Sequence, residues 1–93
     1  MSDVPDLIRQ KSKTNPNFYE VSVPKGYVLF NEGDDAHHLY VVSSGSLEIF
    51  DNSTKQQIAV LSKGSAFGEQ AVLSGGKRSA SVRAVESSVC LEI

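Results

Sequence analysis

The sequence predicts a mainly β fold, a sandwich or a barrel of short strands interrupted by one short helix. Short apolar runs recur along the chain after residue 16, and Gly, Pro, Asn, Asp and Ser separate them. Only the stretch 69–73 reads convincingly as a helix within this series, and it is too short to be stable without tertiary contacts or a ligand. The chain has 93 residues, enough for one modest core and not for two domains.

The first sixteen residues differ in texture from the rest of the chain, being polar and sparsely apolar. Asp3 can cap a short helix with Pro5 in its first turn, and basic residues stand near its expected end: Arg9, Lys11 and Lys13. Such a helix would need a partner to dock against. Since the residue before a proline avoids helical geometry, Asn15-Pro16 is expected to end it. We therefore divide the chain into an N-terminal segment, 1–16, and a β domain, 17–93.

Strands are expected wherever an apolar run lies between two turn signals. Residues 18–23 alternate, which places Tyr19, Val21 and Val23 on one side of the first strand. Turns are expected at the glycine- and asparagine-rich positions that follow each run, such as Pro24-Lys25-Gly26. The expected strands are 18–23, 28–30, 39–42, 46–50, 58–61, 81–85 and 89–93.

Charge and composition limit the function classes. The formal net charge is −2, which disfavours a nucleic-acid surface on this piece. The one cysteine, Cys90, cannot form an internal disulfide and is expected to be a packed apolar residue, which favours a reducing compartment. No segment is apolar enough for a membrane span or a signal peptide. We therefore expect a cytoplasmic domain that contacts neither nucleic acid nor a membrane.

The sequence disfavours two enzyme classes, so no enzyme is expected. A metal site would need converging ligands, but His37 and His38 are adjacent and would point to opposite faces of a strand. Glu48 could add a carboxylate, yet no third histidine exists. A hydrolase would need a serine in a nucleophile turn with a histidine base, and no serine has that context. No metal and no cofactor are therefore expected.

The stretch 67–82 carries the chemistry that is most informative about function. It groups Gly68, Glu69 and Arg78 around the short helix. Free backbone N–H groups at a helix start favour phosphate, and an arginine adds a planar, permanently charged donor. A glutamate would repel phosphate, but it can accept a hydrogen bond from a hydroxyl group. A phosphate and a sugar hydroxyl bound by one small loop suggest a nucleotide.

These residues resemble the phosphate-binding cassette of the cyclic nucleotide-binding domain family. That family includes domains of protein kinase A regulatory subunits, cyclic nucleotide-gated channels and the catabolite activator protein. The resemblance covers about residues 18 to 93, and Gly33-Asp34, 39–42 and Gly45 are similar to its earlier glycine-marked hairpins. The cassette residues that match in order and spacing are Phe67, Gly68, Glu69, Ala71, Val72, Leu73, Arg78, Ser79, Ala80, Ser81 and Val82. The sequence departs from the pattern at Gln70, where an apolar residue is commoner, and at Lys77.

The resemblance implies an antiparallel β-roll of jelly-roll type with the phosphate-binding helix inserted between strands. It also implies a role for each main cassette residue: Gly68 lets the backbone approach the ligand, Glu69 accepts the ribose 2′-hydroxyl and Arg78 grips the cyclic phosphate. Ala71 would lie against the phosphate, and Ser79 would contact either the phosphate or a guanine amino group. The residues expected to bind ligand are Phe67, Gly68, Glu69, Gln70, Ala71, Arg78, Ser79 and Ala80.

The function expected from this resemblance is a regulatory module that binds cyclic AMP or cyclic GMP and controls an attached effector. The alternative is a domain that keeps the fold without binding nucleotide and serves as a protein-interaction module. Family members usually continue into helices that cover the base, whereas 89–93 still reads as a strand. We therefore expect a fragment cut before these lid helices, with its effector outside it: a kinase, channel, exchange factor or transcription factor.

Overall fold

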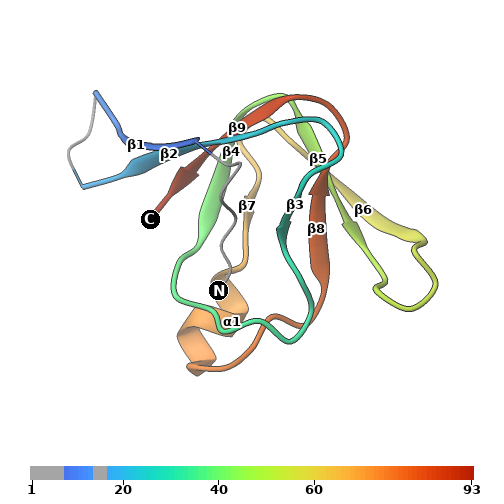
Figure 1. The fold of residues 1–93 in the computed structure, drawn as a ribbon. Coiled ribbons are helices and arrows are strands. Elements are labelled where there is room, and N and C mark those ends of the chain that lie inside the picture. Colours follow the sequence, from blue (N-terminus) through green and yellow to red (C-terminus); the bar gives the residue numbers. More distant parts are fainter. Residues whose placement is uncertain (1–7, 14–16) are drawn as a thin grey trace.

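The computed structural model describes residues 8–13 and 17–93, which form two antiparallel sheets with a short helix at one end (Figure 1). One sheet has the strand order β1-β2-β9-β4-β7 and the other β3-β8-β5-β6. The strands are β1 (Ile8–Lys11), β2 (Tyr19–Val23), β3 (Val28–Phe30), β4 (Tyr40–Ser44), β5 (Ser46–Phe50), β6 (Gln57–Ser62), β7 (Ala66–Phe67), β8 (Ser81–Ala84) and β9 (Ser88–Glu92). The helix is α1 (Glu69–Ser74). The expected mainly β class and antiparallel β-roll are confirmed.

The core lies between the two sheets and is built by alternation along the strands. Val21 and Val23 of β2 are buried, as the alternation of this strand predicted. Cys90 is fully buried on β9, the middle strand of its sheet, where it packs in the main apolar cluster. Leu47 of β5 contributes from the other sheet. Apolar burial from both faces therefore holds the sheets together.

The helix α1 belongs to the segment in which the chain crosses from one sheet to the other. Before it, β7 is an edge strand paired with β4; after it, β8 lies between β3 and β5. Figure 1 shows α1 at the end of the molecule where the chain makes this crossing. The six residues of α1 are too few for an independent helix, so their conformation depends on contacts with the sheets. The crossing thereby places α1 and the start of β8 together at one mouth of the roll.

Two elements differ from the expectations. The helix expected near the N-terminus is wrong over Ile8–Lys11, which forms β1 and pairs antiparallel with β2; its expected start at Asp3 lies outside the described residues. The edge position offers β1 main-chain partners along β2, and this tertiary contact outweighs the local helix signals. The strand β7 was not expected, because two residues are too few to show a periodic pattern. Within the described ranges, no helix is long and apolar enough to cross a bilayer.

Candidate functional site

A pocket of about 260 Å³ opens between α1 and the sheet β3-β8-β5-β6, beside the start of β8. Its lining combines the crossing segment with apolar side chains from β3, β5, β6 and β8. The lining residues are Phe30, Ile49, Leu61, Ala66, Phe67, Gly68, Glu69, Gln70, Ala71, Arg78, Ser79, Ala80 and Val82. All eight residues expected to bind ligand are among them, and they come from two segments, 67–71 with the first half of α1 and 78–80 just before β8.

The turn at Gly68 brings the backbone close to Arg78. Gly68 precedes α1 with φ of 84°, in the left-handed region that side chains other than glycine rarely adopt. A Cβ atom added there would lie 2.7 Å from Arg78 Nη1. Glycine is therefore required at this position for two reasons, its backbone conformation and the space that the guanidinium occupies.

Arg78 is the central charge of the pocket and is only 5% exposed. Its Nη1 donates a hydrogen bond to the Gly68 carbonyl at 2.9 Å, and its Nη2 donates to the His38 carbonyl at 2.6 Å. Its buried Nε has no hydrogen-bond partner among the described residues. Burial lowers the pKa of the guanidinium from its ordinary value. A buried cation held by neutral carbonyls, with one donor left over, is an arrangement that favours an added anion.

Aromatic rings form the floor beneath this guanidinium. The Arg78 guanidinium carbon lies 4.1 Å from the centroid of the Phe30 ring and 5.8 Å from that of Tyr40. The Tyr40 and Phe67 rings are stacked at a centroid distance of 5.6 Å. Cation–π attraction and tight packing therefore fix the guanidinium from below and leave its edge for polar partners.

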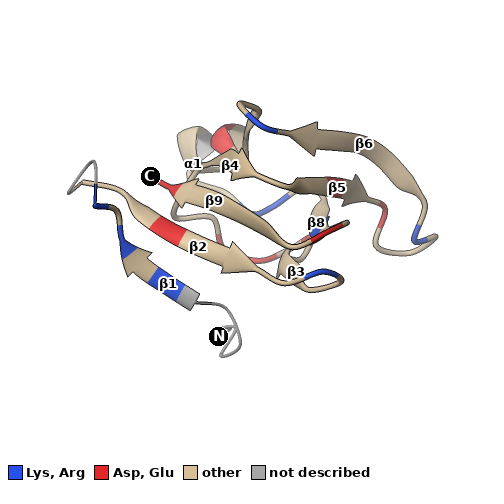
Figure 2. Cartoon of the chain, turned by 90° about the horizontal axis from the view of Figure 1, so that it is seen from above, with Lys and Arg blue, Asp and Glu red and all other residues tan. Residues whose placement is uncertain are grey.

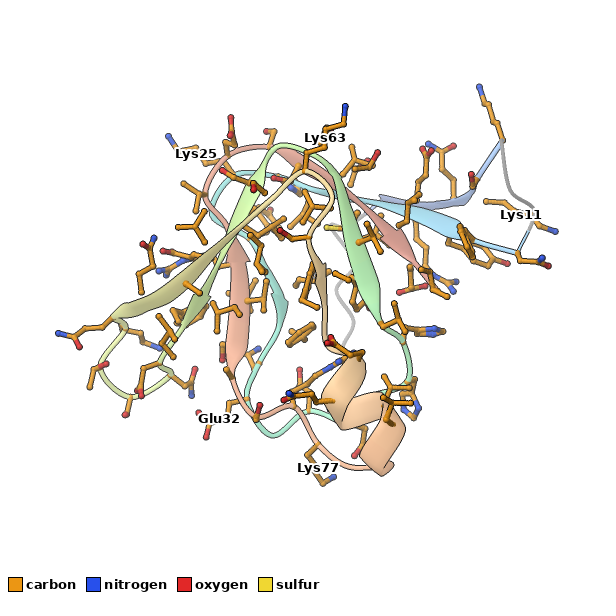
Figure 3. The ribbon with its side chains drawn as sticks, turned by 180° about the vertical axis from the view of Figure 1, so that it is seen from behind. Lys11, Lys25, Glu32, Lys63 and Lys77 are labelled. Atoms are coloured by element: carbon orange, nitrogen blue, oxygen red, sulfur yellow. The ribbon has the colours of Figure 1, made fainter. Side chains whose placement is uncertain are left out.

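Main-chain hydrogen bonds hold the segment around Arg78 against the β3–β4 loop. The Arg78 N–H donates to the Asp34 carbonyl and the Gly33 N–H donates to the Arg78 carbonyl, both at 2.8 Å. Next to them, Lys77 Nζ pairs with the Asp35 carboxylate, and this partner lowers the pKa of Asp35. Lys77 projects from the surface beside α1 (Figure 3) and does not line the pocket. At this departure from the family pattern, Lys77 therefore pairs with Asp35 and stays outside the pocket.

The rim of the pocket is polar and accessible. Glu69, Gln70 and Ser79 are exposed, whereas Ala71 and Ala80 are partly buried. Among the described residues, the Glu69 carboxylate has no hydrogen-bond or ion-pair partner, so its oxygens can accept hydrogen bonds from a ligand. The same pocket therefore has a hydrogen-bond acceptor at its rim, the Glu69 carboxylate, and a buried donor, the Arg78 guanidinium. A sugar hydroxyl can use the first and a phosphate the second.

A second polar group lies behind the aromatic floor. The Tyr40 hydroxyl donates a hydrogen bond of 2.9 Å to the carboxylate of Glu92, which is only 8% exposed. Arg9 Nε of β1 donates to the other oxygen of the same carboxylate. Burial, and then the adjacent Glu92 carboxylate, raise the pKa of Tyr40 above its ordinary value. Tyr40 thus connects the aromatic floor beneath Arg78 to the ion pair between Arg9 and Glu92.

Sequence reasoning missed the residues that complete the pocket. The apolar walls Ile49 and Leu61 were expected in strands but not at this mouth, because a strand pattern shows which residues face inward and not what they face. Val82 matched the cassette but was not among the residues expected to bind ligand. His38 contributes its carbonyl oxygen to the site and not its imidazole. No three His, Cys, Asp or Glu side chains converge as metal ligands in the described ranges 8–13 and 17–93.

Comparisons with known proteins agree with the geometry. The family described as "Cyclic nucleotide-binding domain" matches residues 20–93. An uncharacterised protein of Mycobacterium tuberculosis is 40% identical over 76 residues, covering 82% of this chain and 15% of the relative. The cyclic AMP receptor protein of Thermus thermophilus is 37% identical over 73 residues, covering 75% of this chain and 34% of the relative. The chain thus spans only 15% and 34% of the lengths of these two curated relatives.

Solved structures also share the fold of this chain. The EAL enzyme Bd1971 in its cAMP-bound form superposes with a TM-score of 0.74 at 32% identity, covering 80% of this chain and 21% of that one. The same enzyme in a cGMP-bound form gives the same TM-score and identity. Because the family match spans most of the chain and includes the whole pocket lining, the chain belongs to the cyclic nucleotide-binding domain family.

Proposed function

We propose that this chain is a sensing module whose pocket binds a cyclic nucleoside monophosphate and whose occupancy controls an effector outside the chain. The observation that carries the proposal is the buried Arg78 guanidinium, which is held by two neutral carbonyls and retains an unpaired Nε. Buried charges in proteins are ordinarily paired, so an anionic ligand would supply the partner that the protein does not. A cyclic phosphate carries one negative charge and acceptor oxygens suited to this donor.

The remaining lining residues suit the rest of the ligand. Glu69 would accept the ribose 2′-hydroxyl, and the backbone at Gly68 and Ala71 would lie against the phosphate. The apolar walls Ile49 and Val82 would contact the uncharged ring atoms. The pocket volume of about 260 Å³ lies just below the usual range of about 300–1,000 Å³ for ligand sites, which suits a ligand that is only partly enclosed. We infer that the base extends to the mouth, where the exposed Ser79 lies.

The role of the piece is regulatory in this proposal, and its regulatory ligand is the cyclic nucleotide, with no further cofactor. Control of an effector is inferred from the relatives, because the chain covers only 15% and 34% of the two curated proteins and the remaining length has room for other parts. Cyclic AMP and cyclic GMP are both candidate ligands, because the exposed Ser79 hydroxyl at the mouth can contact either the phosphate or a guanine amino group.

Calorimetric titration with cyclic AMP, cyclic GMP and 5′-AMP tests the proposal against its alternative, a domain that retains the fold as a protein-interaction module. We expect saturable one-to-one binding of a cyclic nucleotide and weaker binding of 5′-AMP, whose open, more highly charged phosphate differs in shape and charge. Absence of binding by all three, in a protein that is folded by circular dichroism, would favour the interaction module instead.

A further inference from the structure

The ion pair between Arg9 and Glu92 joins the first strand to the end of β9. Glu92 is 8% exposed, and its two carboxylate oxygens accept hydrogen bonds from Arg9 Nε and the Tyr40 hydroxyl. The Arg9 side chain is 47% exposed, and its guanidinium carbon lies 3.9 Å from the centroid of the Tyr19 ring. In Figure 2 the basic residues of β1 and the acidic end of β9 flank β2. Arg9 is therefore the cation that neutralises a nearly buried carboxylate.

Tyr40 places this carboxylate within electrostatic reach of the pocket. Its hydroxyl lies 2.9 Å from Glu92 Oε2, and the centroid of its ring lies 5.8 Å from the Arg78 guanidinium carbon. Tyr40 and Glu92 are both buried, so little water screens a charge at Glu92 from one at Arg78. An anion brought to Arg78 would therefore sense whether Glu92 is neutralised.

We propose that Arg9 is a positioning residue of the nucleotide site, which acts through Glu92 and Tyr40 to set the affinity for the anionic ligand. This inference rests on the proposed function. With β1 in place, Arg9 cancels the negative charge of Glu92, and the ligand meets the full positive field of Arg78. Without Arg9, the uncompensated Glu92 carboxylate repels the phosphate and partly offsets the positive field of Arg78. Since coupling is reciprocal, ligand binding must also hold β1 more firmly on β2.

The test is a double-mutant cycle on the full 93-residue chain, with cyclic AMP affinity measured by calorimetry. Arg9→Ala is expected to raise the Kd about three- to tenfold, the order of effect that one uncompensated carboxylate exerts through the buried Tyr40 side chain. Arg9→Lys, which keeps the charge, should restore most of the affinity. Lys11→Ala is the matched control, because Lys11 is exposed on the same strand and projects away from the body of the molecule (Figure 3). The Kd of this variant for cyclic AMP should change less than twofold.

The background Glu92→Gln separates this coupling from simple fraying of β1. Glutamine keeps polar atoms for Arg9 and Tyr40 but carries no charge, so Arg9→Ala should have no effect on affinity in this background. An Arg9→Ala protein that binds like the native chain would overturn the inference, and so would an equal loss in both backgrounds. Failure of the native chain to bind cyclic nucleotide at all would instead overturn the proposed function, and this inference with it.

As a second readout, amide hydrogen exchange of β1 should slow when saturating cyclic AMP is added. The slowing should be seen in the native chain and be lost in Glu92→Gln. Unchanged exchange in the native chain at saturation would contradict the reciprocal half of the inference.

Discussion

Arg78 connects three parts of the chain before any ligand is considered. Its side chain reaches the carbonyls of Gly68 and His38, and its backbone is bonded to the loop containing Asp34. The same guanidinium rests on the Phe30 ring. A residue that organises its own pocket in this way has a structural and a binding role, and experiments on it must distinguish the two.

Substitution of Arg78 tests the binding role. Charge-assisted hydrogen bonds are worth roughly 1.5–3 kcal/mol, so Arg78→Ala should weaken cyclic nucleotide binding on the order of tenfold to a few hundredfold. Arg78→Lys should recover only part of the affinity, because lysine lacks the planar fork. Calorimetry measures both. Lys63→Ala controls for net charge, because Lys63 is exposed, lies outside the pocket lining and is at the opposite end of the molecule from α1 in Figure 3. Unchanged affinity in a folded Arg78→Ala protein would remove this residue from the site.

The free carboxylate of Glu69 makes a separate prediction about the sugar. If Glu69 accepts the ribose 2′-hydroxyl, the native chain should bind the 2′-deoxy analogue of a cyclic nucleotide more weakly, by about 0.5–1.5 kcal/mol for the lost hydrogen bond, because the exposed carboxylate is hydrated when it has no partner. Glu69→Ala should largely erase this preference. Glu32→Ala, which removes another exposed carboxylate outside the pocket, should keep it. Competition binding with both analogues decides, and equal affinities in the native chain would show that the role is misassigned.

Residue by residue, the sequence predicted the polar half of the site better than the apolar half. The eight expected residues lie within fourteen positions of the chain, so local spacing was enough to group them. Phe30 belongs to β3 and Tyr40 to β4, and their position beneath Arg78 depends on the packing of the two sheets. Glu92 gave no signal, because a charged residue near a strand end is ordinarily exposed.

At the scale of elements, the turn before α1 explains how so short a helix is placed. Gly68 and Gly75, both in the left-handed region, bound the helix, and Gly75 and Gly76 donate N–H bonds to the carbonyls of Val72 and Ala71. The sequence predicted this helix and the main strands because turn residues separate them. It predicted neither β1, whose strand conformation depends on pairing with β2, nor the order of strands in the sheets, which depends on long-range contacts.

Replacing Gly68 isolates the contact between this turn and Arg78. Gly68→Ala introduces a left-handed alanine and a Cβ that would lie 2.7 Å from Arg78 Nη1. Gly26→Ala is the matched control, because Gly26 has φ of 86° with nothing within 4 Å of the added Cβ. Both should lose about 1–2 kcal/mol of unfolding free energy from the backbone strain. Only Gly68→Ala should also weaken nucleotide binding, since the guanidinium must move.

Urea unfolding and calorimetry of the two glycine variants give the answer. Equal binding by Gly68→Ala and Gly26→Ala would contradict the assigned contact, whatever their stabilities.

At the scale of the whole molecule, Cys90 links stability to alkaline pH. Burial raises the pKa of its thiol to about 12, from 9.0. Between these values the unfolded chain has released this proton and the folded chain retains it, so stability is present below pH 9 and falls as pH rises toward 12. The slope approaches about 1.4 kcal/mol per pH unit for one proton. Tyr40, whose pKa is also raised, adds a loss that begins at a higher pH.

Denaturant unfolding at pH 8, 9 and 10 measures this dependence. Cys90→Ala should lower stability at every pH by the cost of a small cavity, but it should flatten the decrease between pH 9 and 10 relative to the native chain. An identical slope in both proteins would show that the thiol is not the group responsible.

A cyclic nucleotide bound between the α1 turn and the start of β8 should be visible in amide NMR spectra of the native chain titrated with cyclic AMP. We expect saturable chemical-shift changes concentrated at residues 67–71 and 78–80, with smaller changes at Phe30 and His38, which contact Arg78. Amides at the tip of the β5–β6 hairpin, residues 53–56, which do not line the pocket, should move little. Spectra that do not change, or changes centred away from these two segments, would contradict binding at this site.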